Sequence, residues 1–71
     1  MTWWRNVISE MVTEVGYDDE KQWLLIKWKK SAKTSAYEGV PEGVADELSK
    51  APSVGSMIIS EIKPYYKHRY V

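Results

Sequence analysis

Hydrophobic residues in the first half of the chain follow the spacing of strands. They alternate with polar residues, or fall in β-branched runs, within Met11–Tyr17, Trp23–Lys30 and Ser35–Val40. A period of two is typical of half-buried strands. Polar segments at 18–22 and 30–34 separate the three runs and suit turns. We therefore predict three strands joined as a meander.

The middle strand has the clearest pattern, because its two faces differ. One face carries Leu24, Ile26 and Trp28, and the other carries Trp23, Leu25, Lys27 and Lys29. We expect the first set to face the core and the second set to lie on the opposite surface of the sheet.

After Pro41 the spacing becomes that of helices. Pro41 suits a first helical turn, and the apolar residues Val44, Leu48 and Ala51 share one face. Pro52 ends this helix, and Ser53 is a favourable N-cap for a second one that ends at Pro64. The apolar stripe of the second helix is Val54, Met57, Ile58 and Ile62. The predicted fold is α+β, a three-stranded antiparallel β-meander followed by two α-helices packed on one face of the sheet.

Length and composition limit what else the chain contains. Its 71 residues predict a single domain over 1–71. No cysteine is present, so we expect no disulfide and no cysteine-based zinc site, and with one histidine we expect no other metal and no cofactor. No apolar run reaches the roughly 20 residues that span a bilayer, and MTWWRN lacks the apolar core of a signal peptide. We expect a cytoplasmic protein that does not bind membranes.

Charge is balanced overall but comes in blocks. Ten basic and ten acidic residues cancel, although a non-specific nucleic-acid binder usually has a basic excess. The basic residues nevertheless gather in 27–33 and in the C-terminal segment KPYYKHRYV, and neither segment contains an acid. Folding could gather these blocks into patches.

Several short motifs in a fixed order resemble the KTSC domain, a small domain named for the C-terminus of some lysyl-tRNA synthetases. They are Gly16-Tyr17-Asp18, Leu24-x-Ile26-x-Trp28, Tyr37-x-Gly39-Val40-Pro41, Leu48-x-x-Ala51-Pro52-Ser53-x-Gly55, and Ile62 with Tyr66. The resemblance covers about Val7 to Val71. It implies a stand-alone bacterial or phage protein without an established activity, for which RNA binding has been suggested.

The chain departs from the family pattern at three places. The family's Tyr-x-Tyr before Val-Pro has Ser35 at its first position and Tyr37 at its second. An aromatic pair and an Asn in the last helix are replaced by Met57, Ile58 and Ile59. The first hairpin lacks the family's usual glycine. Tyr66 matches a recurrent tyrosine, so we expect it to dock on the core.

We do not expect catalysis. His68 and several serines coexist, but no Gly-x-Ser-x-Gly elbow is present, and no pair of carboxylates is placed by its spacing in a dry cleft. A solvated or hydrogen-bonded histidine explains His68 as well.

Two segments are candidates for binding RNA or single-stranded DNA: the lysine-rich segment that follows the middle strand's start at Trp23, and the basic C-terminal segment. Basic residues interleaved with rings hold single strands by charge and stacking. The candidate residues are Lys27, Lys29, Lys30, Lys33, Tyr37, Lys67 and Arg69. The alternative is a solvated strand whose lysines deter edge pairing.

The start of the second helix is a candidate anion site. Ser53 and Gly55 lie where free backbone N–H groups could hold a phosphate. The alternative is a simple N-cap, with Gly55 allowing a close approach to a neighbouring element.

Trp4 and Ile59 are candidates for a protein interface. Adjacent Trp3 and Trp4 cannot both point inward from a strand, and Ile59 lies off the apolar stripe of its helix. These residues support a second hypothesis, an accessory protein of bacterial or phage origin that binds a protein partner or a second copy of itself.

Overall fold

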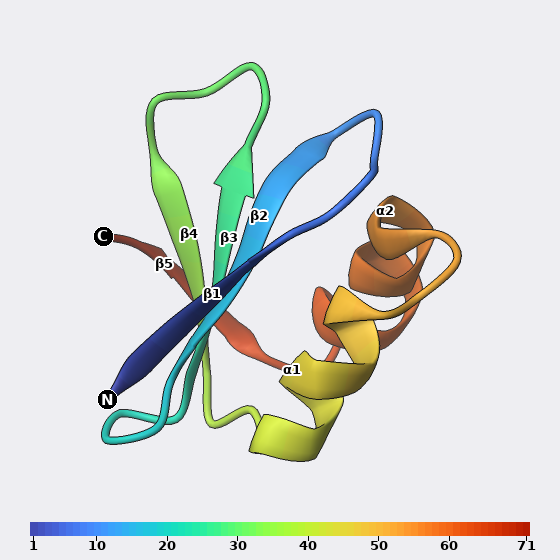
Figure 1. Ribbon diagram of the computed structural model, residues 1–71. Coiled ribbons are helices and arrows are strands. Elements are labelled where there is room, and N and C mark those ends of the chain that lie inside the picture. The colour runs from blue at the N-terminus through green and yellow to red at the C-terminus, as the bar shows by residue number, and fades with distance from the viewer.

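A five-stranded antiparallel sheet forms the frame of the protein in the computed structural model, which describes residues 1–71 (Figure 1). The strands lie in chain order: β1 (Thr2–Asn6), β2 (Val12–Asp18), β3 (Trp23–Trp28), β4 (Thr34–Glu38) and β5 (Lys67–Tyr70). Between β4 and β5 come α1 (Glu42–Ser49), α2 (Val54–Met57) and the π-helix η1 (Ile58–Ile62). The helices pack on one side of the sheet and leave the other side open.

The α+β class is confirmed, but the prediction of three strands is wrong because the sheet has five. The strands that the sequence pattern missed, β1 and β5, are the two edges of the sheet. No residue of either strand is fully buried. Edge strands of this kind lack the alternation of buried and exposed positions on which the prediction depends.

The side of the sheet under the helices carries the core. Val12, Val15, Leu24, Ile26 and other apolar residues of β2 to β4 are inaccessible to solvent there, together with residues of α1, α2 and η1. Leu24 and Ile26 therefore face the core as predicted. Trp28 is only partly buried at its edge, so it contributes less to the core than its strand position indicates. Tyr66 packs partly buried against the same core, as expected.

Tyr17 connects the sheet to the segment that enters α1. Its hydroxyl donates a buried hydrogen bond of 2.6 Å to the carbonyl of Val40. The preceding Gly39 has a φ of +72°, a left-handed conformation that glycine adopts without steric cost. The chain therefore turns at Gly39 and begins the helical layer at Pro41.

The second predicted helix is present but changes its winding. Residues 54–57 are α-helical, and Ile58–Ile62 is a π-helix in which the Lys63 N–H donates to the Ile58 carbonyl at 2.7 Å. Ser53 occupies the N-cap position without a side-chain capping bond. Its hydroxyl instead bonds the Ser56 hydroxyl at 2.9 Å.

Candidate functional site

The open side of the sheet has a continuous row of residues across all five strands. Backbone pairing places Trp4, Gly16, Leu25, Ala36 and Arg69 opposite one another in turn. Leu25 and Ala36 are buried although no helix covers this side. Larger side chains of the same face must therefore shield them, and we call this surface the open face.

Trp4 lies across the backbone of β2. A Cβ atom added to Gly16 would approach the Trp4 ring to 2.5 Å, so the glycine is what allows the ring to lie flat there. The Nζ of Lys27 lies 4.5 Å from the centroid of this ring, within reach of a cation–π interaction. The same amine is 3.5 Å from a carboxylate oxygen of Glu14.

Trp23 forms a second aromatic position on the open face. Two cations lie over its ring, the Lys21 amine at 4.6 Å and the Arg69 guanidinium at 5.2 Å from the centroid. Arg69 also donates to Glu38 at 2.7 Å. Lys67, opposite Glu38 in the pairing of β4 and β5, is exposed on the same face.

The remaining predicted lysines lie at one end of the sheet. Lys29, Lys30 and Lys33 belong to the exposed connection between β3 and β4. The Lys33 amine lies 4.8 Å from the centroid of the Tyr70 ring. Lys29 comes after the last residue of β3, so it does not share the sheet face with Lys27 as predicted.

Tyr37 lies on the opposite side of the sheet from Lys27, Lys67 and Arg69, with which it was grouped. Its side chain belongs to the buried core cluster under the helices, and only 5% of the residue is exposed. Burial, followed by the nearby Tyr70, raises the pKa of Tyr37 above its usual value of 10. Tyr37 therefore does not contribute to the open face.

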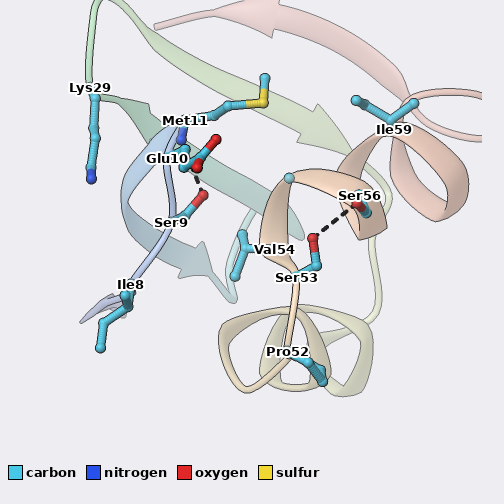
Figure 2. Close-up of a pocket in the computed structure, with 11 residues that line it drawn as sticks. Ile8, Ser9, Glu10, Met11, Lys29, Pro52, Ser53, Val54, Ser56 and Ile59 are labelled. Atoms are coloured by element: carbon cyan, nitrogen blue, oxygen red, sulfur yellow. Dashed lines mark hydrogen bonds between the residues drawn. The ribbon is translucent and has the colours of Figure 1, made fainter.

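A hollow between the β1–β2 loop and α2 contains the candidate anion residues. Figure 2 shows Ser53, Ser56 and Val54 on one side and Met11, Glu10 and Lys29 on the other. A Cβ atom on Gly55 would lie 3.3 Å from the Met11 sulfur. Gly55 thus permits the close approach of α2 to the start of β2, which was the structural alternative for this glycine.

The two candidate interface residues lie on different surfaces. Trp4 is on the open face, with 37% of the residue exposed, and Ile59 is on η1 in the helical layer, with 57% exposed. One flat contact therefore cannot include both. Trp3, the neighbour of Trp4, turns to the helices, where its indole N–H donates to Glu42 at 3.0 Å.

Trp23 was placed on this face by the sequence but was not among the candidate binding residues, and Lys21 was not singled out at all. The alternation of β3 places Trp23 on the face of Lys27, but Lys21 is in the turn before the strand. Its position over the Trp23 ring depends on how that turn folds, with Gln22 at a φ of +57°.

Acidic and histidine side chains do not gather into a group of three that could hold a metal ion. No helix has the length and the apolar character needed to cross a membrane.

Comparison with known proteins identifies the family. The sequence profile of the KTSC domain matches residues 8–66. The chain belongs to the KTSC domain family. A crystal structure of a KTSC domain protein from Yersinia pestis superposes with a TM-score of 0.88 at 27% sequence identity, over 100% of this chain and 99% of that chain. No curated protein matches the sequence.

The KTSC motifs present in this chain lie mainly where they hold the fold. Gly16 supports the Trp4 ring, and Tyr17 bonds the Val40 carbonyl. Val40, Leu48 and Ile62 are inaccessible to solvent. Most residues of these motifs therefore lie in the core or support it, and the open face carries mostly residues outside the motifs.

Proposed function

We propose that this KTSC domain protein is a non-enzymatic binding module that holds RNA or single-stranded DNA on its open face. The observation that carries the proposal is the pair of tryptophans, Trp4 and Trp23, each with a cation between 4.5 and 5.2 Å from its ring centroid. Single strands are bound where aromatic rings stack bases and nearby cations contact phosphates.

The charges on the open face favour a weak complex that depends strongly on salt. Lys27 and Arg69 are each paired with a carboxylate, Glu14 and Glu38 respectively. A bound phosphate would exchange with these carboxylates instead of meeting a free cation. Both cations are themselves about half exposed, with 46% of the Lys27 side chain and 52% of the Arg69 side chain accessible to solvent.

Lysines beyond the face extend the basic surface toward one end of the sheet. Lys29, Lys30 and Lys33 lie on the β3–β4 connection without an acidic residue between them. A strand that crosses the open face from Trp23 to Lys27 would continue onto this connection. We also propose a cytoplasmic location, where RNA is available to such a surface.

Fluorescence anisotropy with labelled single-stranded RNA and DNA tests the proposal. We expect binding at low salt, with a slope of log K on log salt near −0.7 for each phosphate contacted. The double variant Lys27→Gln/Arg69→Gln should bind at least about tenfold more weakly and reduce that slope by about 1.4. Lys50→Gln, an exposed lysine at the end of α1 and outside both proposed surfaces, is the matched control and should bind as the parent does.

The absence of any binding at low salt and millimolar oligonucleotide would contradict the proposal. So would equal losses in the double variant and in Lys50→Gln, because a general charge effect would then explain the binding. Nuclear magnetic resonance (NMR) peaks of the Trp4 and Trp23 indole N–H groups should shift on binding, whereas that of Trp3 should not.

A protein partner is the second candidate function. Ile8 is fully exposed and Ile59 is 57% exposed, and both line the hollow of Figure 2. Exposed apolar residues beside a hollow favour a contact with another protein. Capture of a partner from lysate that persists after nuclease treatment and is lost in Ile59→Asp would favour this function over nucleic-acid binding.

A further inference from the structure

We propose that a groove between β5 and η1 binds a small planar aromatic molecule that carries an anionic group. The groove has a volume of about 550 Å³, which is in the range of small-molecule sites. It lies on the helical side of the sheet and is separate from the open face. Its lining consists of Met11, Trp28, Ser35, Tyr37, Ile58, Ile59, Lys63, His68 and Tyr70.

Aromatic rings supply the walls of the groove. His68 lies next to Tyr37, with ring centroids 5.1 Å apart, and meets Tyr70 edge-on at 4.7 Å. Trp28 adds a fourth ring from β3, and Ile58 and Ile59 add an apolar side from η1. A flat aromatic molecule is the shape and the chemistry that such walls accept.

A short chain of hydrogen bonds fixes the polar floor. The Trp28 indole N–H donates to the Ser35 hydroxyl at 2.8 Å, and that hydroxyl also contacts His68 Nε2 at 2.9 Å. The indole can only donate, so the Ser35 oxygen accepts from it. Ser35 is buried and held from both sides, so these three side chains are already oriented before a molecule enters.

Tyr37 has a hydroxyl without a partner in the protein, although 95% of the residue is buried, since only 5% is exposed. Every side-chain oxygen or nitrogen that is completely inaccessible does have a partner. The Tyr37 hydroxyl must therefore retain some open surface, and this groove is the hollow that Tyr37 lines. Burial keeps the hydroxyl protonated by raising its pKa, so it is available as a donor.

The charge of the lining favours an anion. None of the residues of the groove is acidic, and Lys63 places an exposed ammonium group at its edge. Tyr37 provides a further O–H donor. Lys63 follows directly on the π-helix, and its backbone N–H donates to the Ile58 carbonyl. Short π-helical turns of this kind occur frequently at functional sites.

A carboxylate and a phosphate offer the same chemistry to this groove. An aromatic carboxylate would place its ring between Trp28 and Tyr70 and its charge at Lys63. A free mononucleotide would place a base and a phosphate in the same way. The shared requirement is one planar ring and one anionic group, and the experiment separates the two sources.

NMR titration with two pairs of small molecules tests the proposal. Anthranilate and adenosine 5′-monophosphate carry the anionic group, and anthranilamide and adenosine are their uncharged counterparts. We expect at least one of the anions to shift the Trp28 indole N–H and the His68 ring signals. Its uncharged counterpart should bind at least about tenfold more weakly, since a charge-assisted hydrogen bond is lost.

Two variants of the groove and two matched controls make the result specific. Lys63→Gln should weaken binding of the anion by about tenfold, and Tyr37→Phe by at least about threefold, because each removes one polar contact. Tyr65→Phe and Lys50→Gln lie outside the groove and outside the open face, and should bind as the parent does. Melting curves would verify that Tyr37→Phe, which keeps the ring, remains folded.

Binding of anthranilate alone would identify a carboxylate ligand, and binding of the mononucleotide alone would identify a phosphate ligand. Both results support the proposal. The absence of shifts at Trp28 and His68 with all four molecules at millimolar concentration would overturn it. Shifts that Tyr37→Phe and Lys63→Gln leave unchanged would overturn it as well. Because the groove and the open face lie on opposite sides of the sheet, failure of single-strand binding on the open face would not affect this result.

Discussion

The Trp4 ring can lie against the β2 backbone because residue 16 is a glycine. The indole ring lies so close to the Gly16 backbone that a methyl group there would overlap it at 2.5 Å. Alanine at position 16 would therefore force the ring away from β2. Gly16, which has no side chain, thus allows the Trp4 ring to take the position in which it forms part of the proposed stacking surface.

Ser35 shows how a small residue determines a site. The family resemblance described above implies a tyrosine at this position, whereas Ser35 has its side chain under the helices, where it is buried. A tyrosine ring from the same position would extend toward the groove between β5 and η1. The serine leaves that space open and keeps only the polar floor.

Replacing Tyr17 by Phe tests the bond that connects β2 to the entry of α1. The change removes a buried donor from the Val40 carbonyl and leaves that carbonyl unpaired. We expect a loss of about 1–2 kcal/mol in the free energy of unfolding, measured by urea denaturation. Tyr65→Phe, at a residue that is 73% exposed, is the control and should change stability by less than about 0.5 kcal/mol. Equal effects of the two variants would show that the Tyr17 bond does not stabilise the fold.

At the scale of elements, β1 is held to the helical layer through polar contacts. Arg5 donates to Asp46 at 2.5 Å and to the Ser49 hydroxyl at 2.9 Å, and Trp3 bonds Glu42. All three acceptors belong to α1. Arg5 and Lys50 hold the pKa of Asp46 below its usual value of 3.8.

The lowered pKa of Asp46 predicts how stability depends on pH. A depressed pKa means that the charged carboxylate stabilises the folded state at a pH above 3.8, and that this contribution is lost as the pH falls through the folded value. Asp46→Asn should therefore lower the melting temperature at neutral pH, and the difference from the parent should shrink as the pH falls below 3.8. Glu47→Gln, a neighbouring exposed acid, should not show this convergence. A constant difference across the pH range would contradict the assignment.

The edge strand β5 shapes both sides of the sheet. Arg69 and Lys67 lie on the open face, whereas His68 and Tyr70 line the groove on the other. The C-terminal basic and aromatic segment is therefore not a free arm. Within β5, strand alternation places Lys67 and Arg69 on one side of the sheet and His68 and Tyr70 on the other.

At the scale of the whole molecule, the two faces of one sheet differ in composition. The helical side contains the core and the groove, and the open face contains Trp4 and Trp23, each with a cation near its ring. The folded chain is small, with a radius of gyration of 10.6 Å. A domain of this size has little stability to spare, so the edge strands matter to the whole.

Deletion of residues 67–71 tests the contribution of β5 to the whole domain. The deletion exposes the edge of β4 and removes the contacts of His68 with Ser35 and Tyr37. We expect β1 to β4 and the helices to remain folded, with a loss of stability on the order of 2 kcal/mol. Urea denaturation measures the loss, and amide exchange shows whether β2 and β3 stay protected. An unchanged midpoint would mean that β5 is not part of the cooperative unit.

The hydrophobic pattern was sufficient to predict the strands and helices that bury one face. The strands β2, β3 and β4, the helix α1 and the second helical segment were all predicted from it, as was the burial of Leu24 and Ile26. The order of short motifs was sufficient for the KTSC family, which the match over residues 8–66 confirms. In each case the signal comes from residues near one another in the chain.

Only the tertiary structure decided which residues share a surface. The strands β1 and β5 form by pairing with β2 and β4. Their own residues are mostly exposed and do not show the hydrophobic alternation that predicts a strand. The pairing separates Tyr37 from Lys27, places Trp4 over Gly16, and puts Lys21 beside Trp23. Local sequence determines which segments become strands and helices, because propensity and periodicity are local. Which side chains meet depends on register across strands that are far apart in the chain.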